Sequence, residues 1–379
     1  LPLLKEYALA LFKKNQFVLG IDISPSAVKL VELSRTGQRY KVEAIAFEPL
    51  PEGSMENRNP VDLDQVRQAI KRAVKTSGTR LKQAAVAVPT SSVIIRTIPM
   101  PLEFGEDEIE ANIQLDASQY IPFPLEEIYL DFQIIPGSAR ESAGTQDVML
   151  VASRQENVEL RREVLQESGL KPLIVDVEAY ALENTFRLLP KGLLSSSQQD
   201  SSRKTDDISD NKLIALVDIG ATITTVYILD GDKVVFIREQ NFGGEQLTLA
   251  IAEAYGLNRE RAELCKKRPT DLPEDYATCI LDGFYKSAAD QINQALQFFY
   301  SSDHFHTSPA LKLDGIILAG GGAINTELER TLGEYLQIPT AICNPFIQMD
   351  HASRINRHIL LRDAPLFAVA CGLALRSFD

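Results

Sequence analysis

Two aspartates each stand near the end of an apolar run and precede a turn of small or hydroxyl residues. Asp22 lies in residues 17–24, and Asp218 lies in residues 213–220. Each run predicts a buried strand, and a second strand rich in β-branched residues follows each turn. The N–H groups and hydroxyls of such turns can hold phosphate oxygens, while the carboxylate orients Mg²⁺ directly or through water. An ordinary β-hairpin is the alternative for each aspartate taken alone.

Three consecutive glycines, Gly320, Gly321 and Gly322, follow a third apolar run at residues 315–319. Glycines after a strand let the backbone approach a ligand closely, and a following helix can direct its N-terminus towards that ligand. A simple tight turn is the alternative. The run lacks the Gly-Lys-Ser/Thr ending of a Walker A loop, and no GxGxxG pattern follows a strand. The sequence therefore predicts neither a P-loop nor a dinucleotide-binding fold.

The order of strand, aspartate, turn and second strand occurs twice, roughly two hundred residues apart, which predicts a duplicated fold. Apolar spacing predicts the elements that must position the motifs. Helices are expected at residues 62–77, 106–119, 155–168, 244–255, 280–300, 325–336 and 365–375, and further strands at 84–88, 93–98 and 147–152. The predicted class is α/β with two lobes and an inserted small α+β subdomain.

The domain boundaries follow from a polar stretch near the midpoint. Residues 195–207 contain no large apolar side chain and cannot bury enough surface to order themselves. The predicted parts are an N-terminal amphipathic segment (1–16), a first half (17–83 and 171–195), an inserted partner-binding subdomain (84–170), a flexible linker (196–210), a second half (211–240 and 310–379) and a further subdomain (241–309).

Composition excludes several classes of protein. The net charge of -13 argues against a nucleic-acid binder, and an acidic protein at an anionic membrane would need a protein partner there. The four cysteines form no CxxC pair, which indicates inert thiols in a reducing compartment. No apolar run approaches the roughly 20 residues that span a bilayer. Residues 1–14 resemble neither a secretion signal nor a transmembrane helix, and a helix packed on the body is the alternative to a membrane-touching one.

The three motifs, in this order and spacing, resemble the phosphate and adenosine motifs of the actin, Hsp70 and sugar-kinase superfamily. Within it, the chain resembles the type IV pilus assembly proteins of the PilM family, which are related to the division protein FtsA. The segments that carry this resemblance are residues 20–33, 120–124, 175–179 and 241–245. One departure is Pro25, which stiffens a turn where many superfamily members have glycine. The resemblance covers essentially the whole chain and implies an actin/Hsp70/ribonuclease-H-like duplicated fold.

The resemblance implies a site for ATP or ADP with Mg²⁺, in which Asp22 and Asp218 organise the metal. The phosphate-contacting positions would be Ser24, Ser26, Lys29, Gly220, Ala221, Thr222 and Thr224. Glu245 would border the adenosine together with Gly320, Gly321 and Gly322. Glu178 falls where actin-like proteins hold a residue that positions water, with a helix-cap or salt-bridge role as the alternative. For Lys29 the alternative is an exposed strand residue. Slow turnover, if any, is expected.

The resemblance also implies partners. Tyr120, Ile121 and Phe123 would line a groove for the cytoplasmic N-terminal tail of a PilN-like inner-membrane protein, and core packing of the same residues is the alternative. Pilus motor ATPases and further copies of the chain are the other expected partners. The expected location is the cytoplasmic face of a bacterial inner membrane. An FtsA-like division ATPase and a small-molecule kinase of the same superfamily are the alternative functions.

Overall fold

The computed structural model describes residues 17–56, 58–140, 143–194, 213–267, 271–302, 312–324 and 326–379. The predicted N-terminal segment (1–16) and linker (196–210) lie outside these residues. The chain divides into two compact units. Unit 1 contains Leu1–Glu32, Ala46–Glu178 and Leu373–Asp379, and unit 2 contains Leu33–Ile45 and Ala179–Gly372.

The first sheet has six strands in the order β10-β6-β1-β2-β3-β16. Its strands are β1 (Leu19–Ser24), β2 (Ala27–Thr36), β3 (Arg39–Pro49), β6 (Gln83–Val88), β10 (Lys171–Val177) and β16 (Asp350–His351). β1 pairs antiparallel with β2 and parallel with β6, and β10 pairs parallel with β6. Apolar residues of β1, β2 and β6 are almost fully buried against α2 (Leu63–Ser77) and α4 (Gln155–Glu167). α2 begins after Asp62, whose side chain accepts a hydrogen bond from the Gln65 N–H.

The second sheet repeats this arrangement in unit 2. It has the order β13-β12-β11-β14-β15, with β11 antiparallel to β12 and parallel to β14. The strands are β11 (Leu213–Ile219), β12 (Thr224–Asp230), β13 (Lys233–Gln240), β14 (Gly315–Ala319) and β15 (Thr340–Ile342). Apart from the two-residue strand β16 at the edge of the first sheet, each sheet thus places an antiparallel three-strand meander beside two parallel strands. The predicted duplication is confirmed.

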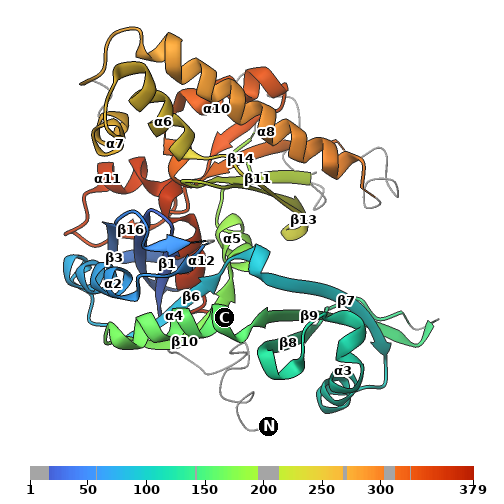
Figure 1. Cartoon of the computed structure of the whole chain (residues 1–379). Helices are drawn as coiled ribbons and strands as arrows, with labels where there is room; N and C mark the ends of the chain where they lie inside the picture. The colour runs from blue at the N-terminus through green and yellow to red at the C-terminus, as the bar shows by residue number, and fades with distance from the viewer. Residues whose placement is uncertain are drawn as a thin grey trace. The chain divides into compact units, whose positions relative to one another are not determined.

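Helices α6 (Gly244–Tyr255), α7 (Arg259–Lys267), α8 (Asp282–Tyr300) and α10 (Thr326–Leu336) contribute apolar side chains to the core of the second sheet. The other helices in this part of the chain are α5 (Glu178–Phe186), α11 (Arg357–Arg362) and α12 (Ala368–Leu375). Figure 1 shows α8 and α10 on one face of this sheet, where their apolar side chains join one buried cluster with β11 and β14. α5 and α12 cross so closely that a Cβ on Gly372 would lie 1.7 Å from the Ala181 carbonyl oxygen.

A separate three-stranded antiparallel sheet lies within the predicted inserted subdomain. Its order is β7-β9-β8, and α3 packs against one face (Figure 1). The elements are β7 (Val93–Pro101), α3 (Glu106–Tyr120), β8 (Ile128–Ile134) and β9 (Thr145–Arg154), and a short hairpin nearer the N-terminus joins β4 (Met55–Glu56) to β5 (Asn59–Pro60). The sequence analysis did not predict β8, although Ile128, Leu130, Phe132 and Ile134 alternate along it in the period of a half-buried strand.

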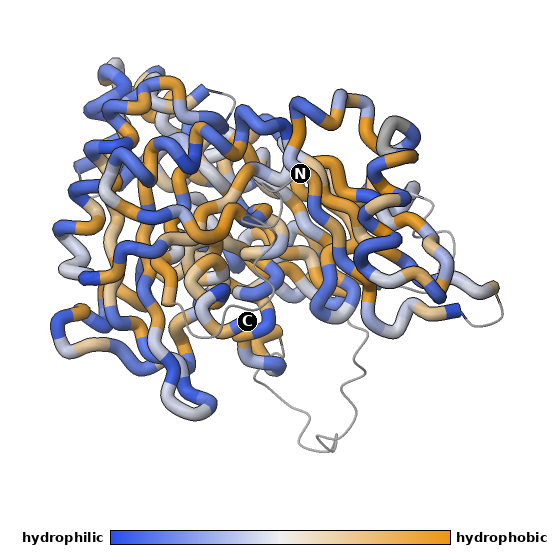
Figure 2. The backbone as a smooth tube through the Cα atoms, turned by 90° about the horizontal axis from the view of Figure 1, so that it is seen from below, coloured by the Kyte–Doolittle hydropathy of each residue, from blue (hydrophilic) through white to orange (hydrophobic). Residues whose placement is uncertain are grey.

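The hydrophobic residues gather in the strands and on the inner sides of the helices, and many turns are hydrophilic (Figure 2). Among the residues that the structure describes, no helix combines the length and the apolar character needed to cross a membrane.

Candidate functional site

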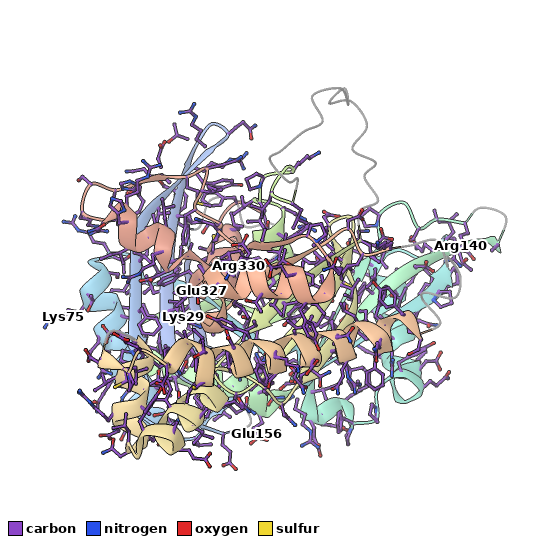
Figure 3. The ribbon with its side chains drawn as sticks, turned by 90° about the horizontal axis from the view of Figure 1, so that it is seen from above. Lys29, Lys75, Arg140, Glu156, Glu327 and Arg330 are labelled. Atoms are coloured by element: carbon purple, nitrogen blue, oxygen red, sulfur yellow. The ribbon has the colours of Figure 1, made fainter. Side chains whose placement is uncertain are left out.

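In unit 1, the first predicted phosphate turn is built around a buried ion pair. Asp22 and Lys29 face each other across the β1–β2 hairpin, and the Lys29 ammonium lies 2.7 Å from Asp22 Oδ2. Lys29 is labelled in Figure 3. Lys29 also donates to Ser24 Oγ at 3.1 Å, and that hydroxyl donates to the Ala27 carbonyl at 2.9 Å. Asp22 and Lys29 are only 6% and 8% exposed, so the alternative that Lys29 is an exposed strand residue is wrong.

This pairing changes what the predicted metal residue can do. A Mg²⁺ ion would have to compete with the Lys29 ammonium for the Asp22 carboxylate, whereas a phosphate would meet a cation already fixed in place. Ser26 lies exposed at the tip of the turn, and its carbonyl accepts a hydrogen bond from the Leu50 N–H at 2.9 Å. The turn is therefore tied to the chain beyond β3 and presents the Ser26 hydroxyl to solvent.

Glu178 is the first residue of α5 and is 8% exposed. Its carboxylate forms an ion pair with Arg58, which lies between β4 and β5. The buried Arg161 beside this pair interacts electrostatically with Glu178, Arg58 and Asp22, and burial is the main reason its pKa falls to about 10. Neither arginine was identified from the sequence, because nothing in the local pattern around residues 58 or 161 indicates a partner more than 100 residues away.

In unit 2, Asp218 occupies the next-to-last position of β11 and is half-buried. The predicted phosphate residues after it differ in exposure: Ala221 is half-buried and Thr222 is exposed, whereas Thr224 is 1% exposed. The Thr224 hydroxyl donates to the Phe242 carbonyl at 2.8 Å. In this structure Thr224 fixes the chain that leads into α6, while Thr222 stands open to a ligand.

The start of α6 rests directly on the Asp218 turn. The Gly244 N–H donates to the Gly220 carbonyl at 3.0 Å, and the Glu245 N–H donates to the Ala221 carbonyl at 2.8 Å. A Cβ on Gly243 would lie 2.6 Å from both of these carbonyl oxygens, so only glycine fits there. Two of the helix's N-terminal donors are therefore used internally, and they are not available to a phosphate.

The glycine loop after β14 packs on the same turn. Gly320 has φ +83°, and a Cβ there would lie 2.3 Å from Asp218 Oδ1 and 2.5 Å from the Ile219 carbonyl oxygen. A Cβ on Gly322 would lie 2.3 Å from a methyl carbon of Ile219, whereas Gly321 is exposed and has room for one. Gly320 is glycine for both its left-handed backbone and its contact with the carboxylate. The structure thus brings the predicted metal residue and the predicted adenosine loop of unit 2 together.

Charged side chains on α7 complete this part of unit 2. Arg259 donates to both carboxylate oxygens of Glu245, at 2.6 and 2.9 Å. Lys266 donates to Thr248 Oγ1 at 2.7 Å and to the carbonyl of the first residue of α6 at 3.1 Å. Burial acts to raise the pKa of Glu263, but hydrogen bonds from Lys266 and Thr248 hold it below its usual value. The sequence analysis missed α7, whose Glu263 and Lys266 at i,i+3 were the available signal.

The predicted partner segment lies at the end of α3. Ile121 is 2% exposed and belongs to the core of the β7-β9-β8 sheet, against which Tyr120 and Phe123 also pack while partly exposed. The Arg154 guanidinium lies 4.6 Å from the centre of the Phe123 ring. All three residues therefore have a packing role, and the outer parts of Tyr120 and Phe123 remain accessible.

Two further observations bear on ligands. Within the described ranges, no group of three or more His, Cys, Asp or Glu side chains could hold a metal ion. A surface cavity of about 520 Å³ lies at the C-terminal end of α10, lined by residues that include Glu329, Gly333 and Thr340. None of the predicted site residues lines that cavity.

Comparison with known proteins gives a consistent picture. The family described as type IV pilus assembly protein PilM matches residues 20–378 of the chain. The chain is similar to a protein of a solved PilM–PilN type IV pilus biogenesis complex, with a TM-score of 0.73 and 28% identity, covering 96% of this chain and 99% of that one. The ethanolamine utilization protein EutJ from Carboxydothermus hydrogenoformans shares the fold, with a TM-score of 0.53 and 15% identity over 98% of this chain and 93% of that chain.

A more distant relative is the cell division protein FtsA of Bacillus subtilis (strain 168), which is 22% identical over 267 residues. The match covers 67% of this chain but only 58% of the length of FtsA. These similarities confirm the predicted actin-like α/β fold and the predicted resemblance to the PilM family and its FtsA relatives.

Proposed function

Because the chain belongs to the type IV pilus assembly protein PilM family, we propose that it is an ATP-binding, actin-like component of the machinery that assembles type IV pili. The observation that carries this proposal is the family match over residues 20–378, supported by the likeness to the PilM–PilN complex. The protein would work on the cytoplasmic face of a bacterial inner membrane. It would bind a PilN-like membrane protein and connect it to the pilus motor ATPases.

Each unit, taken by itself, carries groups suited to nucleotide binding. In unit 2, Asp218 would act on Mg²⁺ of a bound ATP or ADP, because carboxylate oxygen is a ligand that Mg²⁺ prefers. The Gly320 loop would let the nucleotide approach the backbone, and Lys266 would add positive charge beside Gly244 at the start of α6. Considered separately, unit 1 offers the fixed Lys29 ammonium, a group of the kind that pairs with phosphate oxygens.

The nucleotide content of the purified protein tests this part of the proposal. The protein is denatured, and the released nucleotide is identified by ion-exchange chromatography. We expect ATP or ADP from the wild type, and loss of it in Asp218→Asn. Asp230→Asn is the matched control, because Asp230 is exposed at the end of β12. Wild-type protein that is empty and also fails to bind added Mg-ATP would contradict nucleotide binding.

The partner is tested separately with a synthetic peptide of the N-terminal cytoplasmic tail of the PilN-like protein. We expect Phe123→Ala to weaken peptide binding roughly tenfold, as truncation of an aromatic anchor in a peptide groove does. Leu115→Ala is the matched control, because Leu115 lies on the neighbouring helix α3 and is 82% exposed. Equal affinity of wild type and Phe123→Ala, with both proteins folded, would remove Phe123 from the partner site. No binding of the tail by the wild type would contradict the proposed partner.

A further inference from the structure

The turn between β4 and β5 holds a non-glycine residue in an unusual conformation. Arg58 has φ +65°, in the left-handed region that L residues rarely adopt. Such a conformation is unfavourable and persists only where neighbouring structure enforces it. The Arg58 side chain forms an ion pair with the carboxylate of Glu178, which lies 120 positions further along the sequence. The Arg58 side chain is 15% exposed and the Glu178 side chain is 11% exposed. The pair is therefore mostly enclosed but still reachable from solvent.

A second, fully buried arginine enforces this turn. Arg161 is 1% exposed and donates to the Arg58 carbonyl at 2.8 Å and to Asn59 Oδ1 at 2.9 Å. Its remaining donors go to the Ala87 carbonyl at 2.7 Å and the Asn157 carbonyl at 2.9 Å. Asn59 in turn donates to Asn157 Oδ1 at 2.9 Å. The strained turn is thus bonded at both its backbone and its side chains to the buried end of α4.

From this geometry we infer that Arg58 is a positioning residue that holds the Glu178 carboxylate in an ion pair and so keeps it from aligning water for ATP hydrolysis. The inference rests on the proposed nucleotide binding. Glu178 opens α5 at the end of β10 and is the one carboxylate predicted to align water. Arg58 binds that carboxylate, and the Arg161 network holds the Arg58 backbone in place beneath it. The protein would therefore hold ATP without turning it over quickly.

The chemistry at issue is the attack of water on the terminal phosphate. A bond forms between the water oxygen and the γ-phosphorus, and the bond from that phosphorus to the bridging oxygen breaks, so that oxygen leaves on ADP. A carboxylate that orients the water accepts one of its protons and passes it to the released phosphate. A carboxylate whose lone pairs are engaged by a guanidinium is a poor acceptor for that proton.

The test distinguishes the loss of the Arg58–Glu178 ion pair from a general destabilisation of the fold. Arg58→Gly removes the guanidinium and suits the left-handed backbone, and Arg58→Lys keeps the charge. Nucleotide affinity is measured with a fluorescent ATP analogue, and hydrolysis is measured as phosphate released in a single turnover. We expect Arg58→Gly to keep its affinity within about threefold while its hydrolysis rate rises about tenfold or more. Arg58→Lys should stay slow.

Glu178→Gln supplies the decisive comparison. Combined with Arg58→Gly it should abolish the gain. A general loosening of the fold would raise the rate equally with or without Glu178. The inference would be wrong if Arg58→Gly binds nucleotide but hydrolyses it no faster than the wild type. It would also be wrong if the faster hydrolysis persists when Glu178→Gln is added. Either result would leave the proposed nucleotide binding intact. Failure of the wild type to bind nucleotide would overturn the proposed function and the inference with it.

Discussion

Replacing Gly320 by alanine should destabilise the protein and remove Mg-ATP binding together. The new methyl carbon would lie 2.3 Å from Asp218 Oδ1 and 2.5 Å from the Ile219 carbonyl oxygen, both closer than non-bonded carbon and oxygen atoms approach. The carboxylate proposed to act on Mg²⁺ must therefore move, and the end of β11 must move with it. The residue would also have to keep φ +83° or change the path of the loop.

The magnitude follows from two contributions. A left-handed backbone costs an L residue roughly 1–2 kcal/mol. Inserting a methyl group into a closely packed site costs typically about 1–3 kcal/mol. We therefore expect a loss of about 2–5 kcal/mol in the free energy of unfolding. Gly321→Ala is the matched control, since its nearest neighbour is a flexible Leu366 methyl carbon at 3.4 Å, and we expect it to be nearly neutral.

The assay is thermal unfolding of the three proteins with and without Mg-ATP. Wild type and Gly321→Ala should unfold at similar temperatures, and Mg-ATP should raise both, because a ligand that binds only the folded state stabilises it. Gly320→Ala should unfold earlier and show no rise. If Gly320→Ala behaves like Gly321→Ala in both respects, the glycine does not hold the carboxylate in place and this reasoning is wrong.

Three other perturbations have clear expected outcomes. Gly372→Ala should lower the unfolding temperature, because its methyl group would lie 1.7 Å from a backbone carbonyl oxygen of α5, whereas Gly283→Ala in α8 has open space and should not. Lys29→Met should lower the free energy of unfolding by about 3–5 kcal/mol in denaturant titrations, because it leaves the buried Asp22 carboxylate unpaired. Adding Asp22→Asn should restore most of that lost free energy. A thiol reagent should modify only the exposed Cys279 in the native protein and all four cysteines after unfolding.

Local sequence signals were sufficient for much of the fold. The Asp22 and Asp218 strands were predictable because buried runs of β-branched residues end abruptly at a carboxylate and a turn. α2 and α6 were predictable because their apolar residues recur at helical spacing. The strand β8 was not predicted, although Ile128, Leu130, Phe132 and Ile134 alternate along it.

The site was predictable only in part, for a physical reason. Each turn is encoded by adjacent residues, so the sequence could nominate Asp22, Asp218 and Gly320. What those residues contact is decided by chain segments that meet only in the folded state. The Lys29 ion pair follows from the register of one hairpin, and the contact of Gly320 with Asp218 requires β14 to pair beside β11.

The sequence alone determined the duplicated strand-and-turn pattern, the family resemblance and the identity of the chemically capable residues, since these depend on composition and short-range spacing. Only the tertiary structure decided which of those residues already form ion pairs or hydrogen bonds with other residues of the chain. Arg58 and Glu178 lie 120 positions apart, and Arg161 and Arg58 lie 103 apart. Their ion pair and hydrogen bonds are set by the packing of α4 against the first sheet. No local pattern encodes a contact at that separation, because its free energy arises only when the intervening chain has folded.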